Sequence, residues 1–560
     1  MTSSRADAFM SPYQSLQQLS LQLNQRPFLT QPLSDGHIRV YSYREAFDTV
    51  SRLAGGLRQR GLEPGQRIGI LSKNCAEWFI LDWAAQMAGL ITVPLYPTQT
   101  AEHLNEALKA VPVHWLFIGK LDDPTLADAL EVSHLTTANL PYETIGTDLD
   151  WATLTASEPL PETEWVVPTT SDIMTIHFTS GTSGKAQGVK LSYGAYHYAC
   201  QNTRSAMQVT PEDRFLSYLP AAHIAERMMI QGNAVYSGAQ LFFANDLSTF
   251  AADLKRAQPT AFMSVPRLWK NFQTAIHAKL PPSLVNALLA IPGVNRLFGR
   301  LVRRLLGLSH ARLTGSGAAA MPIDLLTWYE KLGIPISEAW GMTETCGLAT
   351  MNYPFQSRSK GTVGRPVPQT EIRVSHEGEL LIRSPGLFSG YFNDDEATTA
   401  AFTEEGYFHT GDLGQWQDNQ TGWALTGRLR DPFKTSKGKF VNPGPIETRL
   451  QQEPLIDLAC VFGENQGQPV AAVQLNQPPG RINGLTEILE NTLVSINGRL
   501  DSHEKLSALL VSDKAWTVES GWLTPTQKVR RRPISEHYQN IHTHPENHSV
   551  ILIKAPPSPR

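Results

Sequence analysis

Residues 67–96 read RIGILSKNCAEWFILDWAAQMAGLITVPLY, and this stretch indicates the class of fold. Its two ends, RIGILS (67–72) and ITVPLY (91–96), have the short apolar pattern of buried strands. Between them, AEWFILDWAAQMAGL (76–90) predicts a helix, for which Asn74 offers a side-chain cap. A strand, a helix and a second strand in this order predict two parallel strands joined by a crossover helix.

The same alternation continues after this stretch. Residues 101–111 have the pattern of a helix, and WLFIG, residues 115–119, has that of a third buried strand. The first third of the chain is therefore expected to form a parallel sheet with helices on its faces.

Later in the chain the pattern changes. EIRV (371–374), a polar SHEG turn and ELLIR (379–383) predict a hairpin. Short β-rich segments follow, with one helix expected at residues 485–496. The sequence predicts an α/β fold in two parts: a large N-terminal α/β domain with parallel sheets and helices, residues 1–429, and a small C-terminal α+β domain, residues 430–560.

The bulk composition is that of a soluble globular protein. The chain has 560 residues, 41% of them apolar and 18% charged, and this length exceeds what one hydrophobic core normally serves. The formal net charge of −4 gives no overall attraction to nucleic acid, which is not expected as a partner. The cysteines show no CxxC spacing, which favours a reducing cytoplasm over a disulfide framework or a zinc site. They are Cys75, Cys200, Cys346 and Cys460.

The sequence predicts neither a secretory signal peptide nor a membrane-spanning helix. The N-terminal MTSSRADAFMSPYQS lacks the apolar stretch of a signal peptide. The most apolar window, residues 79–96, is interrupted by Asp82, Gln86 and Pro94. A cytoplasmic location is expected.

A glycine- and hydroxyl-rich segment, TSGTSGKAQG at residues 179–188, is the strongest local signal. Backbone N–H groups and hydroxyls in such a loop can surround phosphate oxygens. The segment lacks the Gly-x-x-x-x-Gly-Lys-Ser/Thr spacing of a Walker A loop. A flexible surface linker has a similar composition, so composition alone leaves both interpretations open.

A second glycine cluster, GSGAAA at residues 315–320, supports a different hypothesis. It fits the G-x-G-x-x-A pattern of dinucleotide-binding sites, and Glu338 follows about 20 residues later. An NAD-dependent dehydrogenase is therefore an alternative, although nothing downstream resembles a site for hydride transfer.

Five motifs in a fixed order resemble those of the acyl-adenylate-forming, or AMP-binding, superfamily, which includes acyl-CoA synthetases, luciferases and peptide-synthetase adenylation domains. The resemblance spans about residues 40–535. The motifs are the phosphate loop TSGTSGKAQGVKLS (179–192), WGMTE (340–344), YFHTGD (407–412), the domain junction GRLRDPFKTSKGKFVNPGPIE (427–447) and the lysine motif LTPTQK (523–528).

Within the superfamily the chain most resembles the long-chain fatty acyl-CoA synthetases. LPAAHIAER (219–227) is similar to their Leu-Pro-x-x-His-x-x-Glu-Arg segment. VPLYPT (93–98) and SVPRLW (264–269) also resemble segments of these enzymes. The resemblance implies ATP-dependent activation of a fatty, long-chain carboxylic acid through an acyl-adenylate. Thioester formation with coenzyme A follows, with release of AMP and pyrophosphate. An acyl-carrier protein as acceptor is the alternative.

The first half-reaction requires cationic and N–H groups, because a carboxylate must attack a polyanion. The resemblance implies that the phosphate loop holds the β- and γ-phosphates of ATP, that Thr343 contacts the α-phosphate, and that Glu344 binds Mg²⁺ as a hard oxygen ligand. The loop residues are Thr179, Ser180, Gly181, Thr182, Ser183 and Gly184.

For the nucleoside, the resemblance implies that Trp340 stacks on adenine. The backbone along the adenine edge belongs to Gly317, Ala318 and Ala319. Asp412 would accept both ribose hydroxyls, assisted by Arg428.

For the acyl group, the resemblance implies that Lys528 reaches the α-phosphate and the acyl carboxylate during adenylation. His223 would lie near that carboxylate, and Gly438 near the pantetheine path of the second half-reaction. Members of the family reorient the small domain between half-reactions, so the C-terminal domain is expected to be mobile.

The sequence departs from the family pattern at three positions. The phosphate loop usually ends Pro-Lys-Gly, but here it reads Ala186-Gln187-Gly188, with Lys185 as the nearby substitute. The hinge position, commonly Asp or Lys, is Arg430. PGPIE replaces the usual acidic segment near the end of the junction, where Glu447 is kept.

Each residue also has an ordinary structural interpretation. Taken alone, Asp412 is typical of a turn after glycine, Trp340 of a core aromatic, and Glu226–Arg227 of a surface ion pair. His223 could equally be a hydrogen-bonded core histidine. His177 and the cysteines are expected to be structural.

Residues 294–313, VNRLFGRLVRRLLGLSHARL, predict a basic amphipathic helix. Its apolar face comprises Leu297, Phe298, Leu301, Val302, Leu305 and Leu306, and its basic face Arg296, Arg300, Arg303 and Arg304. Such a helix suits peripheral contact with an anionic membrane surface, such as the inner face of a membrane, and equally an ordinary surface helix packed on the core. The run Arg530–Arg532 is expected to be solvated or to face phosphate. The sequence indicates neither the acyl chain length nor the oligomeric state.

Overall fold

The first sheet contains the stretch that indicated the fold class. The computed structural model describes residues 9–142, 146–180, 186–512, 515–524, 527–543 and 550–554. The strand order is β6-β5-β3-β4-β7-β8, parallel except for the β7–β8 pair. The strands are β3 (Arg67–Leu71), β4 (Ile91–Leu95), β5 (Trp115–Ile118), β6 (Thr136–Asn139), β7 (Ile173–Ser180) and β8 (Ala186–Ser192).

The helix predicted between the first two strands is present as α3 (Ala76–Met87), and all of its residues are buried. It packs against α2 (Tyr43–Gln59) and α1 (Pro12–Gln22). The predicted cap is wrong: Cys75 is the N-cap residue of α3, without a side-chain cap. The Asn74 side chain instead binds a distant segment, residues 217–226. The helix predicted at residues 101–111 is α4 (Ala101–Ala110).

Two further sheets complete the central body. One has the order β2-β1-β10-β9, and the other β11-β12-β13-β14-β15. Their strands are β1 (Pro27–Pro32), β2 (Ile38–Ser42), β9 (Arg214–Ser217), β10 (Gln240–Phe243), β11 (Ala261–Ser264), β12 (Leu313–Ser316), β13 (Ile336–Trp340), β14 (Thr350–Met351) and β15 (Arg365–Pro366). Helices α6 (Tyr193–Met207), α9 (Phe250–Ala257), α10 (Pro266–His277), α11 (Pro282–Ala290), α12 (Val294–Leu306) and α13 (Ile323–Lys331) lie around them.

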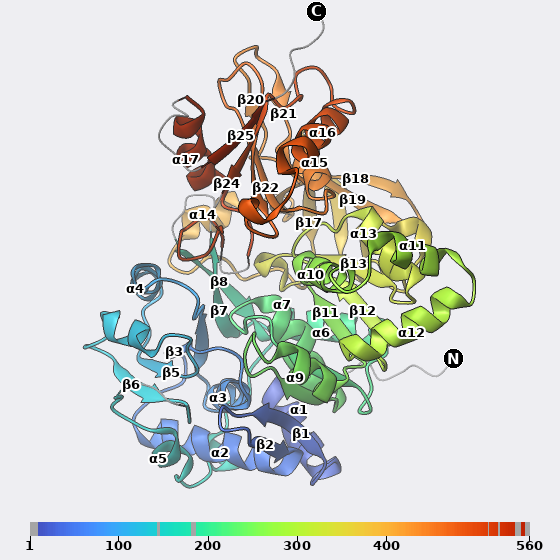
Figure 1. Cartoon of the computed structure of the whole chain (residues 1–560). Helices are drawn as coiled ribbons and strands as arrows, with labels where there is room; N and C mark the ends of the chain where they lie inside the picture. The colour runs from blue at the N-terminus through green and yellow to red at the C-terminus, as the bar shows by residue number, and fades with distance from the viewer. Residues whose placement is uncertain are drawn as a thin grey trace, which may run out of the picture.

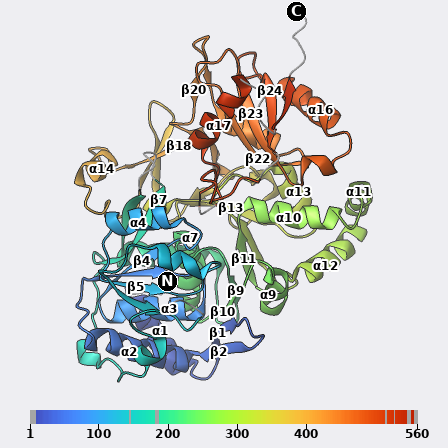
Figure 2. The same ribbon diagram turned by 60° about the vertical axis from the view of Figure 1, so that its left-hand side comes forward.

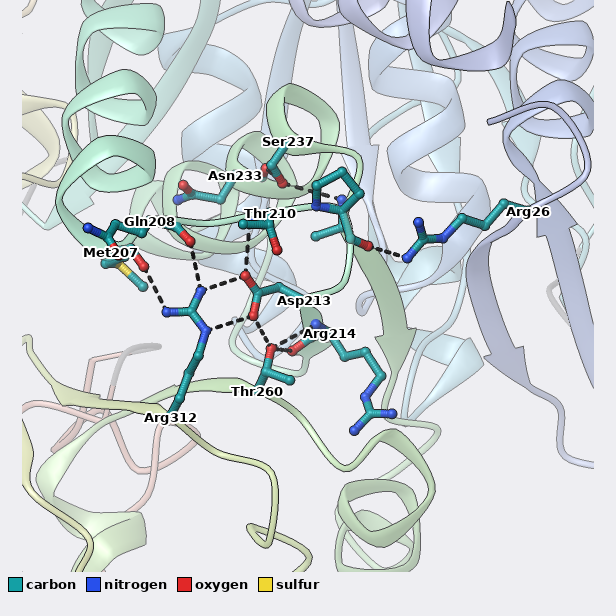
Figure 3. Close-up of polar contacts among 12 residues, drawn as sticks. Arg26, Met207, Gln208, Thr210, Asp213, Arg214, Asn233, Ser237, Thr260 and Arg312 are labelled. Atoms are coloured by element: carbon teal, nitrogen blue, oxygen red, sulfur yellow. Dashed lines mark hydrogen bonds and ion pairs between the residues drawn. The ribbon is translucent and has the colours of Figure 1, made fainter. Parts of the chain in front are cut away.

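A charged network ties these two sheets together (Figure 3). Asp213, just before β9, accepts hydrogen bonds from Arg312 Nη2 at 2.5 Å and from Thr260 Oγ1 at 2.6 Å. Arg312 also donates to the backbone oxygens of Met207 and Gln208 at the end of α6. Because the Asp213 side chain is almost fully buried and its partners come from distant segments, this cluster fixes how β9, β11 and β12 meet.

The predicted hairpin is confirmed. Strands β16 (Glu371–Val374) and β17 (Glu379–Arg383) pair antiparallel in a sheet that continues through β18 (Phe408–Asp418) and β19 (Gly422–Arg428).

The last part of the chain forms a separate lobe at the top of Figures 1 and 2. It has its own sheet, β22 (Ile456–Phe462), β23 (Val470–Leu475), β24 (Ala508–Ser512) and β25 (Val550–Lys554), a two-stranded ribbon, β20 (Phe433–Lys434) and β21 (Phe440–Val441), and its own apolar clusters. The expected helix is α16 (Leu485–Asn497). The prediction of one helix is wrong, because α15 (Pro443–Leu450) and α17 (Arg531–Thr543) are also present. Both begin beside prolines, which weaken a helical pattern in sequence.

Helix α12 differs from its predicted amphipathic form. Phe298 and Val302 are buried, whereas Leu297, Leu301 and Leu305 are 64%, 53% and 60% exposed. The single apolar face predicted from sequence is therefore divided into a buried half and an exposed half. Figures 1 and 2 show α12 at the edge of the molecule.

Candidate functional site

The glycine-rich segment joins β7 to β8. Thr179 pairs with Gln187 and Ser180 with Ala186 in the antiparallel ladder, so the segment forms the connection of a hairpin. Residues 181–185, which include Gly181, Thr182, Ser183, Gly184 and Lys185, lie outside the described residues. Gln187, where the family has lysine, donates from Nε2 to Asp394 Oδ2 at 3.4 Å.

Asp412 lies at the centre of the site, although it is only 6% exposed. Its Oδ2 accepts a hydrogen bond from Trp340 Nε1 at 2.8 Å, and its Oδ1 forms an ion pair with Arg428 Nε at 2.9 Å. Asp412 and Arg428 are cross-strand partners on β18 and β19, whereas Trp340 ends β13 in another sheet. The carboxylate is thus oriented from two sides before any ligand binds.

Trp340 itself is a core residue. It is 6% exposed and packs in an apolar cluster with Leu380, Ile382 and Trp423. This environment accounts for the orientation of its indole toward Asp412. Little of the ring surface is open to a nucleotide, and the predicted stacking on adenine stays a prediction.

The motif after Trp340 folds into a short 3₁₀ turn, Thr343–Thr345. The backbone oxygen of Glu344 accepts from Phe388 N at 2.9 Å, and its Oε1 accepts from Tyr391 Oη at 3.2 Å. Burial raises the pKa of the Glu344 carboxyl. A desolvated carboxylate suits a divalent cation, which would restore the lost stabilisation of its charge.

Lys528 follows a tight turn in the C-terminal lobe. Lys528 N donates to Thr524 Oγ1 at 3.0 Å, and Thr524 N donates to the Lys528 carbonyl at 2.8 Å. The surrounding protein lowers the pKa of the Lys528 ammonium, as does the charge of Arg428, while Asp412 and Glu344 act in the opposite direction. The side chain nevertheless keeps exposed surface. The structure brings the predicted lysine within electrostatic range of both predicted carboxylates.

His223 faces the same space. Its Nδ1 accepts from Ala225 N at 3.1 Å, which caps the short helix α7 (Ile224–Glu226). Burial lowers the pKa of His223 to about 4, with the charge of Lys528 as the second cause. The imidazole is therefore neutral at pH 7 and adds no positive charge to those of Lys528 and Arg428.

Sequence reasoning missed the role of Asn74. Its Nδ2 donates to Ser217 Oγ at 2.8 Å and to the Leu219 carbonyl at 2.6 Å, and its Oδ1 accepts from Ala221 N at 2.8 Å. These contacts hold the segment that carries His223 against the end of β3. No pattern within residues 67–96 indicates partners so distant in sequence.

The Glu226–Arg227 pair, expected on the surface if taken alone, is buried. Arg227 Nη2 pairs with Asp82 Oδ1 of α3 at 2.5 Å, and Nη1 donates to Thr175 Oγ1 at 2.7 Å. His177, expected to be structural, lies 3.2 Å from the same Nη1. Arg227 begins a buried π-helical segment, Arg227–Gly232, a rare geometry that is frequent at functional sites.

Glu226 points elsewhere. Its Oε1 accepts from Asn74 Nδ2 at 3.2 Å, and its Oε2 has no hydrogen-bond partner among the described residues. Burial raises the pKa of Glu226 to about 8, so this carboxyl is protonated at pH 7.

The second glycine cluster does not form a dinucleotide site. Helix α13 begins only at Ile323, after a loop in which Ala318 has φ +69°. Glu338, which would bind the ribose, is buried and accepts from Met321 N at 3.2 Å and Gly361 N at 3.1 Å. Both carboxyl oxygens are thus occupied by backbone. Ala318 and Ala319 are exposed after Gly317, as an adenine-edge role requires, and that role stays a prediction.

Gly438 is not brought to the other predicted residues. It has φ +76° in the turn between β20 and β21 of the C-terminal lobe. The role predicted for Gly438 stays a prediction. The prediction that Arg530–Arg532 are solvated or face phosphate is wrong for Arg531, which forms ion pairs with Glu447 and Asp431.

Comparisons with known proteins decide the family. The profile of the family described as AMP-binding enzyme matches residues 20–392, which is more than half of the chain. The chain belongs to the AMP-binding enzyme family. A second profile, AMP-binding enzyme C-terminal domain, matches residues 431–542 of this AMP-binding enzyme.

Curated relatives of this AMP-binding enzyme cover most of its length. Long-chain-fatty-acid–CoA ligase FadD15 of Mycobacterium bovis is 29% identical, over 91% of this chain and 92% of the relative. Long-chain-fatty-acid–CoA ligase 5 of Rattus norvegicus is 27% identical, over 89% and 83%.

Solved structures share the fold. The A domain of carboxylic acid reductase from Segniliparus rugosus, in complex with AMP and a co-purified carboxylic acid, has a TM-score of 0.77 at 20% identity, over 96% of this chain and 94% of that one. O-succinylbenzoate coenzyme A synthetase from Bacillus subtilis, in complex with AMP, has a TM-score of 0.71 at 21% identity, over 93% and 98%. Among the described residues of this AMP-binding enzyme, none of the helices combines the length and apolarity needed to cross a bilayer.

Proposed function

We propose that the chain is an AMP-forming long-chain fatty acid–CoA ligase. The observation that carries the proposal is the convergence of Lys528 with Asp412, Arg428 and Glu344, from two lobes of the structure. The names of the curated relatives, at 25–29% identity over most of the chain, supply the substrate class. The two parts act as a large AMP- and acyl-binding domain, residues 1–429, and a mobile domain, residues 430–560, that carries the lysine.

The first half-reaction makes the acid reactive. A carboxylate oxygen of the fatty acid bonds to the α-phosphorus of ATP, and the bond from that phosphorus to the bridging oxygen breaks, so pyrophosphate leaves. Negative charge concentrates at the α-phosphate during this step. An ammonium aimed there lowers the barrier, and this is the role we assign to Lys528, with Thr343 as hydroxyl donor.

The other residues hold the nucleotide. Asp412 accepts the ribose hydroxyls, with Arg428 fixing its orientation. Glu344 would hold Mg²⁺, which would neutralise phosphate charge when bound. Contact with the β- and γ-phosphates is assigned to Thr179–Gly184, of which residues 181–184 lie outside the described part of the chain, and contact with the adenine edge to the backbone of residues 317–319.

The second half-reaction transfers the acyl group. The sulfur of coenzyme A bonds to the acyl carbon, AMP departs with the electron pair of the anhydride bond, and the thiol proton is lost to solvent. Gly438 is assigned to the pantetheine path once the C-terminal lobe has turned.

The test is pyrophosphate release with a panel of carboxylic acids, with and without coenzyme A. The expected result is Mg²⁺-dependent release with long-chain fatty acids, AMP rather than ADP as product, and faster turnover with coenzyme A. Acyl-AMP formation without acceleration by coenzyme A would indicate an acyl-carrier protein as acceptor. No carboxylate-dependent AMP formation would overturn the proposal.

We further propose peripheral contact with an anionic membrane surface through α11 and α12. Residues 254–323 contain no Asp or Glu. They contain ten basic residues: Lys255, Arg256, Arg267, Lys270, Lys279, Arg296, Arg300, Arg303, Arg304 and Arg312. Three of them, Arg256, Arg267 and Arg312, are ion-paired with acidic residues outside this range. The α12 arginines supply charge that a leaflet rich in anionic lipid attracts, and a fatty acid substrate also resides in such a leaflet.

The exposed half of α12 supplies apolar contact beside this charge. Leu297, Leu301 and Leu305 are spaced four residues apart and lie on one side of the helix. Each of them directly follows an exposed arginine, which is Arg296, Arg300 or Arg304. Ile291 and Leu284, at 52% and 46% exposure, extend the apolar surface onto the adjacent α11 region. None of the four α12 arginines has an ion-pair partner within the described part of the chain. Leucines flanked by unpaired arginines suit the boundary between headgroups and acyl chains.

A further inference from the structure

Arg267, in the first turn of α10, connects the two lobes. Its Nη1 donates to Gln527 Oε1 at 2.8 Å, and its Nη2 pairs with Asp457 Oδ2 on β22 at 2.9 Å. In Figures 1 and 2, α10 lies beneath the C-terminal lobe. One guanidinium thus contacts both the central sheet of that lobe and the turn that carries Lys528.

The contact with Gln527 acts directly on the lysine turn. Gln527 has φ +63° and precedes Lys528, and its N–H donates to the Thr524 carbonyl at 2.8 Å. Leu523 and Val529 form a bridge at the base of the turn. Because the turn is internally bonded, holding Gln527 also holds Lys528.

Neighbouring groups support the same contact. Asp457 also accepts from Gln474 Nε2 of β23 at 2.9 Å, so its carboxylate is held in position for Arg267. One helical turn after Arg267, Lys270 Nζ donates to the Gln451 carbonyl at 3.2 Å. The charges near Lys270 from the C-terminal lobe are Glu453 and Asp457.

We propose that Arg267 is a positioning residue that holds Lys528 in the site for adenylation and must let go before the second half-reaction. The inference rests on the proposed function. Both of its partners belong to the C-terminal lobe, so rotation of that lobe breaks both contacts at once. Loss of Arg267 therefore slows the step that needs Lys528 in place and spares the step that needs the lobe turned away.

The experiment measures the two half-reactions separately in Arg267→Gln, with Arg373→Gln as the matched control. Arg373 is an exposed arginine of β16 that pairs with Glu405, away from the contact between α10 and the C-terminal lobe. Arg267→Gln should lose about tenfold in the rate of acyl-AMP formation and keep the wild-type rate of thioester formation from supplied acyl-AMP. The control should leave both rates unchanged. Equal losses in both steps, or no loss in either, would overturn the proposal.

A second measurement is independent of catalysis. Amide hydrogen exchange at Gln527 and Lys528 should quicken about tenfold in Arg267→Gln and not in Arg373→Gln. Exchange that stays at the wild-type rate would overturn the positioning role even if the enzyme is active. If the wild-type protein releases no pyrophosphate but exchange at Gln527 and Lys528 still quickens in Arg267→Gln, the proposed function is wrong and the contact made by Arg267 is confirmed.

Discussion

Trp340 and Asp412, 72 residues apart in sequence, are joined by a hydrogen bond of 2.8 Å from the indole Nε1 to the carboxylate Oδ2. With Arg428 on Oδ1, the carboxylate is held by two donors from different sheets. A ligand hydroxyl therefore meets an acceptor whose direction is already set, and binding does not have to order it.

Asp412→Ala should reduce kcat/KM for ATP by at least about tenfold, because charge-assisted hydrogen bonds contribute about 1.5–3 kcal/mol each. Trp340→Phe, which keeps an apolar ring but removes the donor, should show a smaller loss in the same parameter. Steady-state kinetics with varied ATP provide the measurement. Unchanged ATP kinetics in a folded Asp412→Ala variant would exclude the carboxylate from the nucleotide site.

Lys528→Ala should lose about 10²–10³ in the rate of acyl-AMP formation, the usual cost of removing one donor at developing charge. It should still convert supplied acyl-AMP and coenzyme A to thioester at close to the wild-type rate. Single-turnover assays of each half-reaction separate the two effects. Similar losses in both would make Lys528 a general binding or structural residue.

Gln187→Lys tests the departure in the phosphate loop. The native amide contacts Asp394, whose Oδ1 caps α14 (Asp395–Ala400) by accepting from Ala397 N. A lysine there can pair with Asp394 and restore the family's cation, so kcat/KM for ATP should equal the wild-type value or exceed it by up to about threefold. A drop beyond about tenfold would indicate that Lys185 or another group already occupies the space.

Glu226→Gln should change how stability depends on pH. The folded-state pKa of about 8 exceeds the ordinary value of 4.5, so the fold keeps a proton that the unfolded chain releases. Wild-type stability therefore falls as pH rises from 4.5 through 8, and the neutral amide escapes this loss. The difference in free energy of unfolding, variant minus wild type, should therefore increase by roughly 3 kcal/mol between about pH 5.5 and pH 8.

Denaturant titrations of Glu226→Gln at several pH values give this comparison. Glu212→Gln, a change at an exposed carboxyl, is the control and should show no such growth. A pH-independent difference for Glu226→Gln would mean that the buried carboxyl does not titrate in this range.

Membrane contact through α12 predicts salt-sensitive co-sedimentation with vesicles that contain phosphatidylserine. Replacing Arg296, Arg300 and Arg304 by Gln should weaken binding at least about 50-fold, since each arginine near such a surface contributes about 1 kcal/mol. Replacing Leu297, Leu301 and Leu305 by Ser should weaken the binding that persists at high salt. Gln at Arg44, Arg52 and Arg373, all exposed elsewhere, should have little effect. Wild-type protein that stays in the supernatant at low salt would contradict the proposal.

Features that depend on neighbouring residues were predictable from the sequence. The strands and helices of residues 67–118 follow local periodicity, and the structure confirms them within a few residues. The cap assigned to Asn74 was wrong because its side chain is satisfied by residues 217–226, about 150 positions away. The apolar face predicted for α12 is partly buried and partly exposed, because only a strip of a helix packs against the core. Periodicity does not indicate how wide that strip is.

The site shows the same limit. Motif resemblance selected Asp412, Arg428, Glu344 and Lys528, which the structure brings together. It gave no indication that Trp340 donates to Asp412 or that Arg267 holds the lysine turn, because both contacts join residues from different sheets or lobes. Such pairings depend on how the elements pack, which no local pattern encodes.

The acid-free segment has a further consequence for how the molecule approaches a surface. Because residues 254–323 carry ten of the 48 basic side chains and none of the 52 acidic ones, the remaining 490 residues have a formal charge of −14. Within this segment, α12 lies at the edge of the molecule and carries Arg296, Arg300, Arg303 and Arg304, so a negatively charged bilayer exerts a torque on the protein before contact. Within about 10 Å, the screening length at ordinary ionic strength, that torque turns the basic end toward the lipid and the acidic remainder away. Salt would then slow arrival as well as weaken attachment.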